Sequence, residues 1–273
     1  MKGGAGPRSP GTDGRARAGI LRQNSYYDPM VQREAEALAD AGFEVEVLCM
    51  RAPDRPRRAV VNGVTVIRLP VTRRERSKAG KAFAYGCFFL QAAGFLSARH
   101  LRRPYTVIQA NSMPDFLVFA ALVPKLLGCP VVAYLQEPTP ELAATIIGPG
   151  ALIGVLARIE QWAIRFADHT VTVTDQLRQR YIERGAPADR ITVVLNCADP
   201  ATMLRGWSPP PRRRGPGFTL VCHGTIEDRY GQDTIIDAAR LLRDEMPDLR
   251  VVFTGRGSRI PQLTSSIVRH GLQ

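Results

Sequence analysis

The sequence lacks several features that mark familiar protein classes. It contains no run of 18 uncharged apolar residues, so we expect no membrane-spanning helix. Residues 1–17 are rich in Gly, Pro and Arg and have no apolar segment, which predicts a disordered tail rather than a signal peptide. Neither a G-x-S-x-G motif nor a P-loop occurs, so hydrolase and kinase functions have no support.

Cysteine and histidine are also scarce. The five cysteines form no C-x-x-C pair, and the four histidines show no metal-ligand spacing. We therefore expect reduced thiols in a cytosolic compartment and no structural zinc.

Positive charge is in excess and unevenly distributed. The net charge is +12, and residues 1–103 alone hold 19 Lys and Arg against nine Asp and Glu. This asymmetry indicates an anionic partner, such as membrane lipid or a phosphorylated substrate, although a solvated basic surface is the alternative. No nucleic-acid partner is expected, because the basic residues lack interleaved aromatics.

One apolar segment, Phe83–Ser97, is too short to span a membrane. Basic residues flank it on both sides, from Arg73 to Lys81 and from Arg99 to Arg103. The pattern fits a helix at an anionic membrane surface, and the alternative, a core helix with solvated ends, is the commoner case.

Hydrophobic periodicity predicts alternating strands and helices. Strands are expected at residues 18–24, 43–49, 105–110, 129–135, 169–173 and 191–195, with a hairpin over 59–69 around Asn62-Gly63. Helices are expected at residues 31–41, 116–127 and 176–184, with a long helical stretch ending at Phe166. This order predicts an α/β fold with a doubly wound, mostly parallel sheet.

Residues 206–217, rich in Pro, Arg and Gly, interrupt the alternation and predict a linker. We therefore expect a tail at 1–17, a Rossmann-like domain at 18–205, and a second Rossmann-like domain at 218–273. The second domain has strands at 218–222 and 249–254 and helices at 232–245 and 261–269. Two strands seldom form a stable open sheet, so this domain is expected to be incomplete.

Several segments together resemble family-4 glycosyltransferases of the GT-B fold. They are Tyr26–Pro29, Asn111–Asp115, Gln136–Glu141, Arg165–Thr174, Val194–Asp199, His223–Gly231 and Phe253–Gly257. The resemblance implies two Rossmann-like domains that bind a nucleotide-sugar donor between them. It also implies an acceptor in the N-terminal domain, retention of anomeric configuration and no metal cofactor. Bacterial relatives often build surface polysaccharides on lipid carriers at the inner membrane face.

The donor side is expected in the second domain. The residues implied are His223, Gly224, Thr225, Gly231, Gly255 and Gly257, with Arg229 as a catalytic cation. Glycines let the backbone approach the donor phosphates, and the following helix N-terminus favours an anion. The loop departs from the family pattern, since Thr225 and Tyr230 stand where many relatives have Arg and Lys. A plain strand-to-helix turn is the alternative.

The acceptor side is expected where the strands of the first domain end. Glu137 follows a strand and is the second catalytic candidate, orienting an acceptor hydroxyl or the sugar. Relatives often have His-Asp where this sequence has Gln136-Glu137, and the alternative role for Glu137 is a helix-start carboxylate. Glu141 is expected to cap the next helix. The acceptor-binding candidates are Asn24, Tyr26, Tyr27, Asp28, Asn111 and Asp115.

These features favour a retaining glycosyltransferase with a nucleotide-sugar donor and a lipid-linked or glycan acceptor, peripheral to the membrane. In the family, a donor-side motif of two glutamates separated by seven residues lies beyond the region equivalent to Gln273, so we expect a truncated chain. The alternatives are a non-catalytic membrane-surface protein derived from a glycosyltransferase and, third, a GT-B sugar-nucleotide epimerase.

Overall fold

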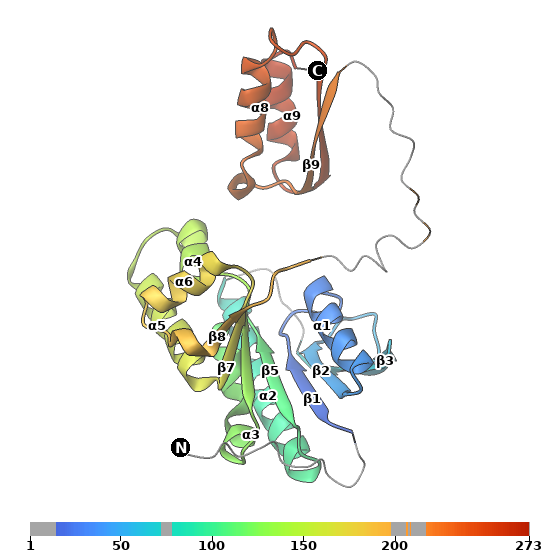
Figure 1. The fold of residues 1–273 in the computed structure, drawn as a ribbon, viewed down its shortest axis with the longest axis vertical. Coiled ribbons are helices and arrows are strands. Elements are labelled where there is room, and N and C mark those ends of the chain that lie inside the picture. The colour runs from blue at the N-terminus through green and yellow to red at the C-terminus, as the bar shows by residue number, and fades with distance from the viewer. Residues whose placement is uncertain (1–14, 72–77, 198–205, 207, 209–216, 273) are drawn as a thin grey trace. The chain divides into compact units, whose positions relative to one another are not determined.

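The computed structural model describes residues 15–71, 78–197, 206, 208 and 217–272. The chain divides into two units, residues 1–197 and 198–273, and each is described by itself (Figure 1). Most of the predicted tail and linker, together with Arg73, Arg74 and Arg76, lies outside the described residues.

Unit 1 is built on an eight-stranded sheet. Its strands are β1 (Arg17–Leu21), β2 (Glu44–Met50), β3 (Arg58–Val61), β4 (Val64–Leu69), β5 (Val107–Asn111), β6 (Val131–Leu135), β7 (His169–Thr172) and β8 (Ile191–Val193). Their order is β3-β4-β2-β1-β5-β6-β7-β8. Every pairing is parallel except β3 with β4, which form the hairpin predicted around Asn62 and Gly63. The predicted doubly wound sheet is confirmed.

Helices cover both faces of this sheet, so that it has a hydrophobic core on each side. The helical elements are α1 (Pro29–Asp40), α2 (Lys78–Arg102), η1 (Asp115–Ala121), α3 (Leu122–Leu126), α4 (Thr139–Ile147), α5 (Ala151–Phe166), α6 (Asp175–Glu183) and η2 (Ala188–Arg190). On β1, Ile20 belongs to the core under α1, whereas Leu21 belongs to the core under α2, η1 and α5. Alternation along a strand therefore sends neighbouring side chains to opposite cores.

Two helix predictions need correction. The expected helix at 116–127 is a 3-10 helix, η1, followed by the short α3. The expected long stretch before Phe166 is two helices, α4 and α5, because Gly148 adopts a φ of 81° at the end of α4. Side-chain repulsion disfavours this left-handed region for most residues, and glycine avoids that cost.

Unit 2 contains the parallel pair β9 (Phe218–Thr225) and β10 (Leu249–Arg256). Its helical elements are η3 (Asp228–Tyr230), α8 (Gln232–Leu241) and α9 (Ile260–Arg269). Both long helices lie on the same face of the two strands (Figure 1), around a small core of Ile226, Ile236 and Leu263.

The strand order of unit 1 reverses direction at β1. The chain passes from β1 to β2 on one side, and β5 then pairs with the other side of β1. Loops that leave β1 and β5 at their carboxyl ends therefore diverge and leave a crevice between them. We expected β1 to extend to Asn24, but it ends at Leu21, which puts residues 22–24 in this crevice.

Candidate functional site

A cavity of about 180 Å³ occupies the crevice at the carboxyl edge of the sheet in unit 1. It is lined by Arg22, Gln23 and Asn24 after β1, Met50 on β2, Tyr85 on α2, Ser112 and Met113 after β5, and Gln136 and Glu137 after β6. Two residues predicted separately, Asn24 and Glu137, therefore lie on the same cavity. Ser112 joins two of the lining loops, because its hydroxyl oxygen accepts a hydrogen bond from the Gln136 amide at 3.1 Å.

Several buried polar atoms of the residues that line this cavity have no hydrogen-bond partner among the described residues. They are Nε and Nη1 of Arg22, Oε1 of Gln23 and Nε2 of Gln136, and all four atoms are buried. A buried polar group without a partner costs roughly 1–3 kcal/mol, so these donors and this acceptor favour a polar ligand. Sugar hydroxyls match such a mixed set, since each can donate and accept.

Arg22 and Gln23 were not predicted as site residues. The rule that ligands bind at the carboxyl ends of parallel strands would have found them if the end of β1 had been placed correctly. Arg22 is held by Asp28, whose Oδ2 lies 2.6 Å from Nη2 of Arg22. Asp28 also caps α1 by accepting from the Met30 amide at 3.2 Å. The structure therefore gives Asp28 a positioning role beside the cavity.

The predicted aromatic pair behaves differently at its two positions. Tyr26 is fully buried in the core under α1, and its hydroxyl donates to Oε1 of Glu36 at 3.2 Å. Its ring is not available to stack on a sugar or nucleotide, so that expectation is corrected for Tyr26. Tyr27 is 43% exposed and packs edge-on against Tyr26, with the Arg55 guanidinium 5.0 Å from its ring centre.

Asn111 is buried and forms a hydrogen bond to Glu34, a residue that the sequence analysis did not single out. Its amide nitrogen donates to Oε2 of Glu34 at 2.9 Å, and Gln109 donates to the same oxygen at 2.6 Å. Burial raises the pKa of Glu34 to about 7, while these two hydrogen bonds lower it. The other oxygen of Glu34 is buried and has no hydrogen-bond partner within residues 15–71, 78–197 and 217–272. Asn111 thus acts on Glu34 and does not line the cavity.

Asp115 is likewise buried at the start of η1 and does not line the cavity. Burial raises its pKa to about 7, the Thr139 hydroxyl lowers it, and the negative Glu160 raises it further. Its Oδ1 atom has no hydrogen-bond partner in the described part of the chain. The carboxyl is therefore a structural group in the core rather than a group facing an acceptor.

Glu137 is the exposed carboxylate of the cavity. Its backbone carbonyl accepts a long hydrogen bond of 3.4 Å from the Tyr181 hydroxyl, which anchors the loop after β6. The expected capping role of Glu141 is not observed, because Pro138 occupies the N-cap of α4. Glu141 instead forms ion pairs with Arg180 and Arg184.

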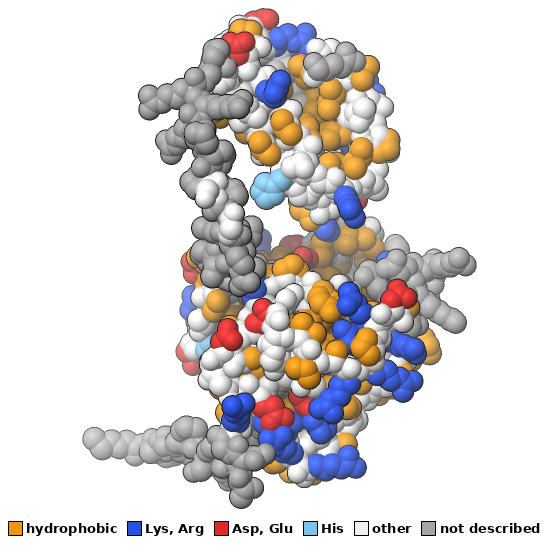
Figure 2. Space-filling model, turned by 90° about the vertical axis from the view of Figure 1, so that its right-hand side faces the viewer, with side chains coloured by type: hydrophobic (Ala, Val, Ile, Leu, Met, Phe, Trp, Pro, Cys, Tyr) orange, Lys and Arg blue, Asp and Glu red, His pale blue; other side chains and the backbone are white. Residues whose placement is uncertain are grey.

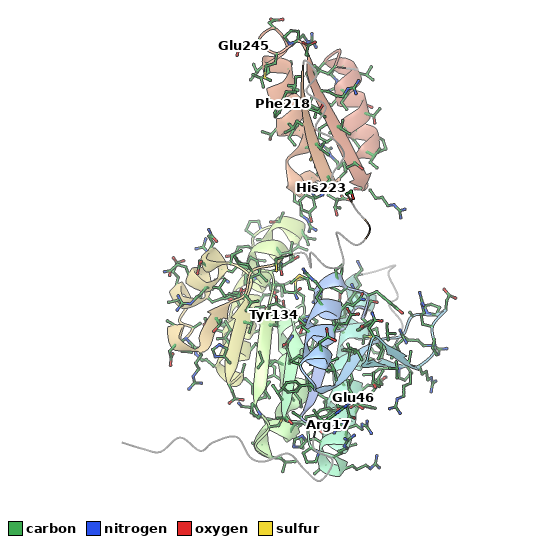
Figure 3. The ribbon with its side chains drawn as sticks, turned by 45° about the vertical axis from the view of Figure 1, so that its right-hand side comes forward. Arg17, Glu46, Tyr134, Phe218, His223 and Glu245 are labelled. Carbon is green, nitrogen blue, oxygen red and sulfur yellow. The ribbon has the colours of Figure 1, made fainter. Side chains whose placement is uncertain are left out.

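The donor-side candidates of unit 2 gather where β9 and β10 end. His223 is exposed near the carboxyl end of β9, far from Phe218 at its start (Figure 3). Gly231 has a φ of 70° and is the N-cap of α8, which has no side-chain capping bond there. Arg229 lies over the Tyr230 ring at 4.9 Å, and its Nη2 donates to the Tyr230 hydroxyl at 3.0 Å. Gly224 and Thr225 lie at the end of β9.

Gly255 and Gly257 are explained by close approach of the two loops. A Cβ atom on Gly255 would lie 1.7 Å from the carbonyl oxygen of Gly224, and one on Gly257 would lie 1.8 Å from that of Ile226. Glu227 ties the same loops together by accepting from the Ser258 amide at 2.8 Å and its hydroxyl at 2.7 Å. Glycine at these positions is therefore needed for packing, whether or not a nucleotide binds nearby.

The doubly wound unit with its carboxyl-edge cavity, followed by a second α/β unit, has the fold of GT-B glycosyltransferases. The family model described as Glycosyl transferase 4-like domain matches residues 27–197, and the chain belongs to that family. A comparison with curated protein sequences gave no match.

Solved structures with the same fold are distant in sequence. Sucrose-phosphate synthase from Thermosynechococcus elongatus is 15% identical, with a TM-score of 0.65 over 94% of this chain and 68% of that one. The lipopolysaccharide outer core galactosyltransferase WaaB is 15% identical, with a TM-score of 0.60 over 94% of this chain and 65% of that one. Anabaena HepE in complex with UDP-glucose is 15% identical, with a TM-score of 0.60 over 94% and 66%. The chain thus spans about two thirds of these structures.

Proposed function

We propose that this chain transfers a sugar from a nucleotide-sugar donor to an acceptor hydroxyl held in the cavity of unit 1. The observation that carries the proposal is that three residues lining this cavity, Arg22, Gln23 and Gln136, hold buried polar atoms with no hydrogen-bond partner in the part of the chain that the structure describes. Together with membership of a glycosyltransferase family, this mixed set of donors and acceptors supports a polyhydroxyl ligand.

In this proposal Glu137 orients the acceptor hydroxyl and accepts a hydrogen bond from it. A carboxylate within hydrogen-bond reach increases the electron density on the attacking oxygen and can take its proton. Arg22, Gln23 and Gln136 hold the rest of the acceptor in place. Orienting the acceptor beforehand lowers the entropic cost of bringing the two substrates together. Glu34, buried beside the cavity loops, is a structural neighbour rather than a reacting group.

The donor diphosphate is proposed to bind at the carboxyl ends of β9 and β10. Its departure places negative charge on phosphate oxygens, which the amides at the N-terminus of α8 and the Arg229 guanidinium would stabilise. Gly224 and Gly231 leave the backbone there open to a ligand. Nearby Asp228 and Asp233 both pair with Arg259, at 2.8 Å and 2.6 Å, so their negative charge is balanced locally.

The finer parts of the proposal follow from the family resemblance. They are retention of anomeric configuration, a lipid-linked or polysaccharide acceptor, hexosyl transfer without a metal, and a role in cell-surface glycan synthesis at the inner membrane face. HepE and a trehalose-6-phosphate enzyme from E. coli were solved with UDP-sugars or an analogue, which supports a nucleotide-sugar donor here.

Calorimetric titration of the chain with UDP, GDP and their sugars tests the donor site. We expect one nucleotide series to bind, and Arg229→Ala to weaken that binding about tenfold or more, because a charge-assisted hydrogen bond is lost. Arg240→Ala, which removes an exposed arginine from the end of α8, is the matched control and should bind as the parent does.

If no nucleotide or nucleotide-sugar binds, the transferase proposal fails for this chain and the non-catalytic alternative gains support. If a nucleotide-sugar binds and is converted to an epimer without an acceptor, the epimerase alternative is correct. Where transfer is measurable, Glu137→Gln should lower turnover by about a hundredfold, and Glu183→Gln should leave it unchanged.

A further inference from the structure

The helix α2 of unit 1 is apolar on the face turned away from the core. Ala84, Phe88, Ala92 and Leu96 recur every four residues and are buried against the sheet. On the opposite side, Phe83 is 75% exposed, Leu90 69% and Leu101 68%. A solvent-facing helix surface is normally polar, so this surface is unusual for a helix that faces water.

Between Phe83 and Leu101 the one Lys or Arg of α2 is Arg99, which pairs with the buried Glu46, and α2 contains no acidic residue. Helix α3 contacts α2 and adds further exposed apolar side chains, Leu122 at 49% and Leu126 at 77% exposure. We name the surface formed by Phe83, Leu90, Leu101, Leu122 and Leu126 the α2 surface. Contiguous apolar patches of this kind mark interaction sites.

Charge indicates which partner the α2 surface fits. Lys81 lies at one end of α2 and Arg102 at the other, so the apolar stripe is bounded by cations at both ends. Figure 2 shows Lys and Arg side chains gathered along one flank of unit 1. A second copy in an antiparallel helix pair would bring these cations together, whereas anionic lipid headgroups complement them. Along the described segments, no helix is long and apolar enough to cross a membrane.

The α2 surface and the cavity share one end of α2. Tyr85 lines the cavity from the first turns of α2, and Phe83 projects outward two residues earlier. Residues two apart lie on different faces of a helix, so a membrane that binds Phe83 would lie near the same end of α2 as the cavity without covering it. This arrangement suits an acceptor that stays anchored in the lipid while its polar head enters the cavity.

We propose that the α2 surface docks unit 1 onto an anionic lipid monolayer, with Phe83 and Leu90 inserted at the headgroup boundary and Lys81 and Arg102 contacting lipid phosphates. The supply of a lipid-linked acceptor through this surface rests on the proposed function, but the docking itself does not. An interfacial helix of this type binds through buried apolar area together with attraction to anionic lipid.

Co-sedimentation of the full chain with lipid vesicles tests the proposal. We expect binding to vesicles of phosphatidylglycerol mixed with phosphatidylcholine, and much weaker binding to pure phosphatidylcholine. Phe83→Gln and Leu90→Gln should each reduce the partition coefficient about tenfold, because an apolar side chain no longer leaves water. The matched control is Val60→Gln on β3, which replaces another exposed apolar side chain, 69% exposed, and should not change binding.

Three results would overturn the proposal: no binding by the parent chain, equal loss in the Val60 variant, or a lipid-free dimer that Leu90→Gln dissociates. A second measurement uses Phe83→Trp, whose fluorescence should shift to shorter wavelength on anionic vesicles, while Val60→Trp should not shift. Neither the co-sedimentation nor the fluorescence measurement requires a nucleotide. Loss of nucleotide binding would therefore leave the docking proposal standing, and loss of vesicle binding would leave the donor site standing.

Discussion

Nη2 of Arg17 lies 3.0 Å from Oε2 of Glu46, and both side chains are almost completely buried between adjacent strands of unit 1 (Figure 3). The Tyr105 hydroxyl donates to the same Glu46 oxygen at 2.5 Å, and Arg99 pairs with Oε1. The guanidinium of Arg17 also lies 4.6 Å from the centre of the Tyr105 ring. One buried carboxylate thus joins β1, β2, α2 and the chain leading to β5 at the amino edge of the sheet.

Removing this carboxylate should destabilise the protein strongly. Glu46→Ala removes the buried carboxylate that pairs with Arg17 and leaves it only the more exposed Glu44 as a carboxylate partner, which costs about 3–5 kcal/mol in unfolding free energy. Glu44→Ala is the control: Glu44 is 31% exposed and its pair with the exposed Arg103 is worth less than about 1 kcal/mol, while Arg17 keeps Glu46, so the loss should be smaller than for Glu46→Ala. Chemical denaturation measures both, and similar small losses in the two variants would contradict a central role for Glu46.

The neighbours Tyr26 and Tyr27 should respond differently to substitution. Tyr26→Ala empties a core position and should cost about 3–5 kcal/mol, whereas Tyr26→Phe removes only the hydrogen bond to Glu36, about 1 kcal/mol. Tyr27→Ala should change stability by less than about 1 kcal/mol. Thermal and denaturant unfolding distinguish these cases. A large loss for Tyr27→Ala would show that the exposed ring also supports the fold.

The buried carboxyl of Asp115 should make stability depend on pH. Its pKa is raised from 3.8 to about 7, so the folded state holds a proton that the unfolded state releases near pH 4. The sign follows from linkage: this contribution is fully present below about pH 4 and is lost as pH rises to about 7. The loss amounts to at most roughly 4 kcal/mol.

Asp115→Asn removes this titration while keeping the shape of the side chain. The difference in unfolding free energy between the variant and the parent should therefore shift in favour of the variant as pH rises from about 4 to 7. Urea titrations across this range measure the difference. A difference that stays constant with pH would mean that Asp115 ionises normally.

Position 257 of unit 2 should accept no residue larger than glycine. Its Cβ would lie 1.8 Å from a backbone oxygen, which cannot move without separating the loops after β9 and β10. Gly271→Ala is the comparison, since its φ of 58° costs roughly 1–2 kcal/mol but its nearest neighbour is a side-chain atom 3.7 Å away. Gly257→Ala should lower the unfolding temperature of unit 2 more than Gly271→Ala. The reverse order would contradict the packing explanation.

Much of the fold was accessible from local sequence signals. The alternation of Phe43, Val45, Val47 and Cys49 predicted β2, whose Val45, Val47 and Cys49 do share one core. The helix predicted at residues 176–184 is α6, and Thr174 caps it, since its hydroxyl oxygen accepts from the Leu177 amide at 3.2 Å. These signals depend on residues within one or two turns of each other, so they survive without knowledge of the fold.

The candidate site was accessible only in part. The position of Glu137 after a strand placed it at the carboxyl edge, where the cavity is. Arg22, Gln23 and Gln136 were not predicted as ligand groups, because only the tertiary structure shows which of their polar atoms find partners among the described residues. Tyr26 and Asp115 were predicted to face an acceptor, but both side chains are buried. A sequence motif specifies residue types and does not say which way each side chain points.

The sequence by itself determined the order of strands and helices, the basic first third and the family resemblance, because each depends on composition or short-range pattern. The tertiary structure alone decided that β1 lies between β2 and β5, and so brought residues 22–24, 112–113 and 136–137 to one cavity. It also decided which side of α2 faces outward. Both outcomes arise from contacts between segments far apart in the chain, whose geometry no local pattern encodes.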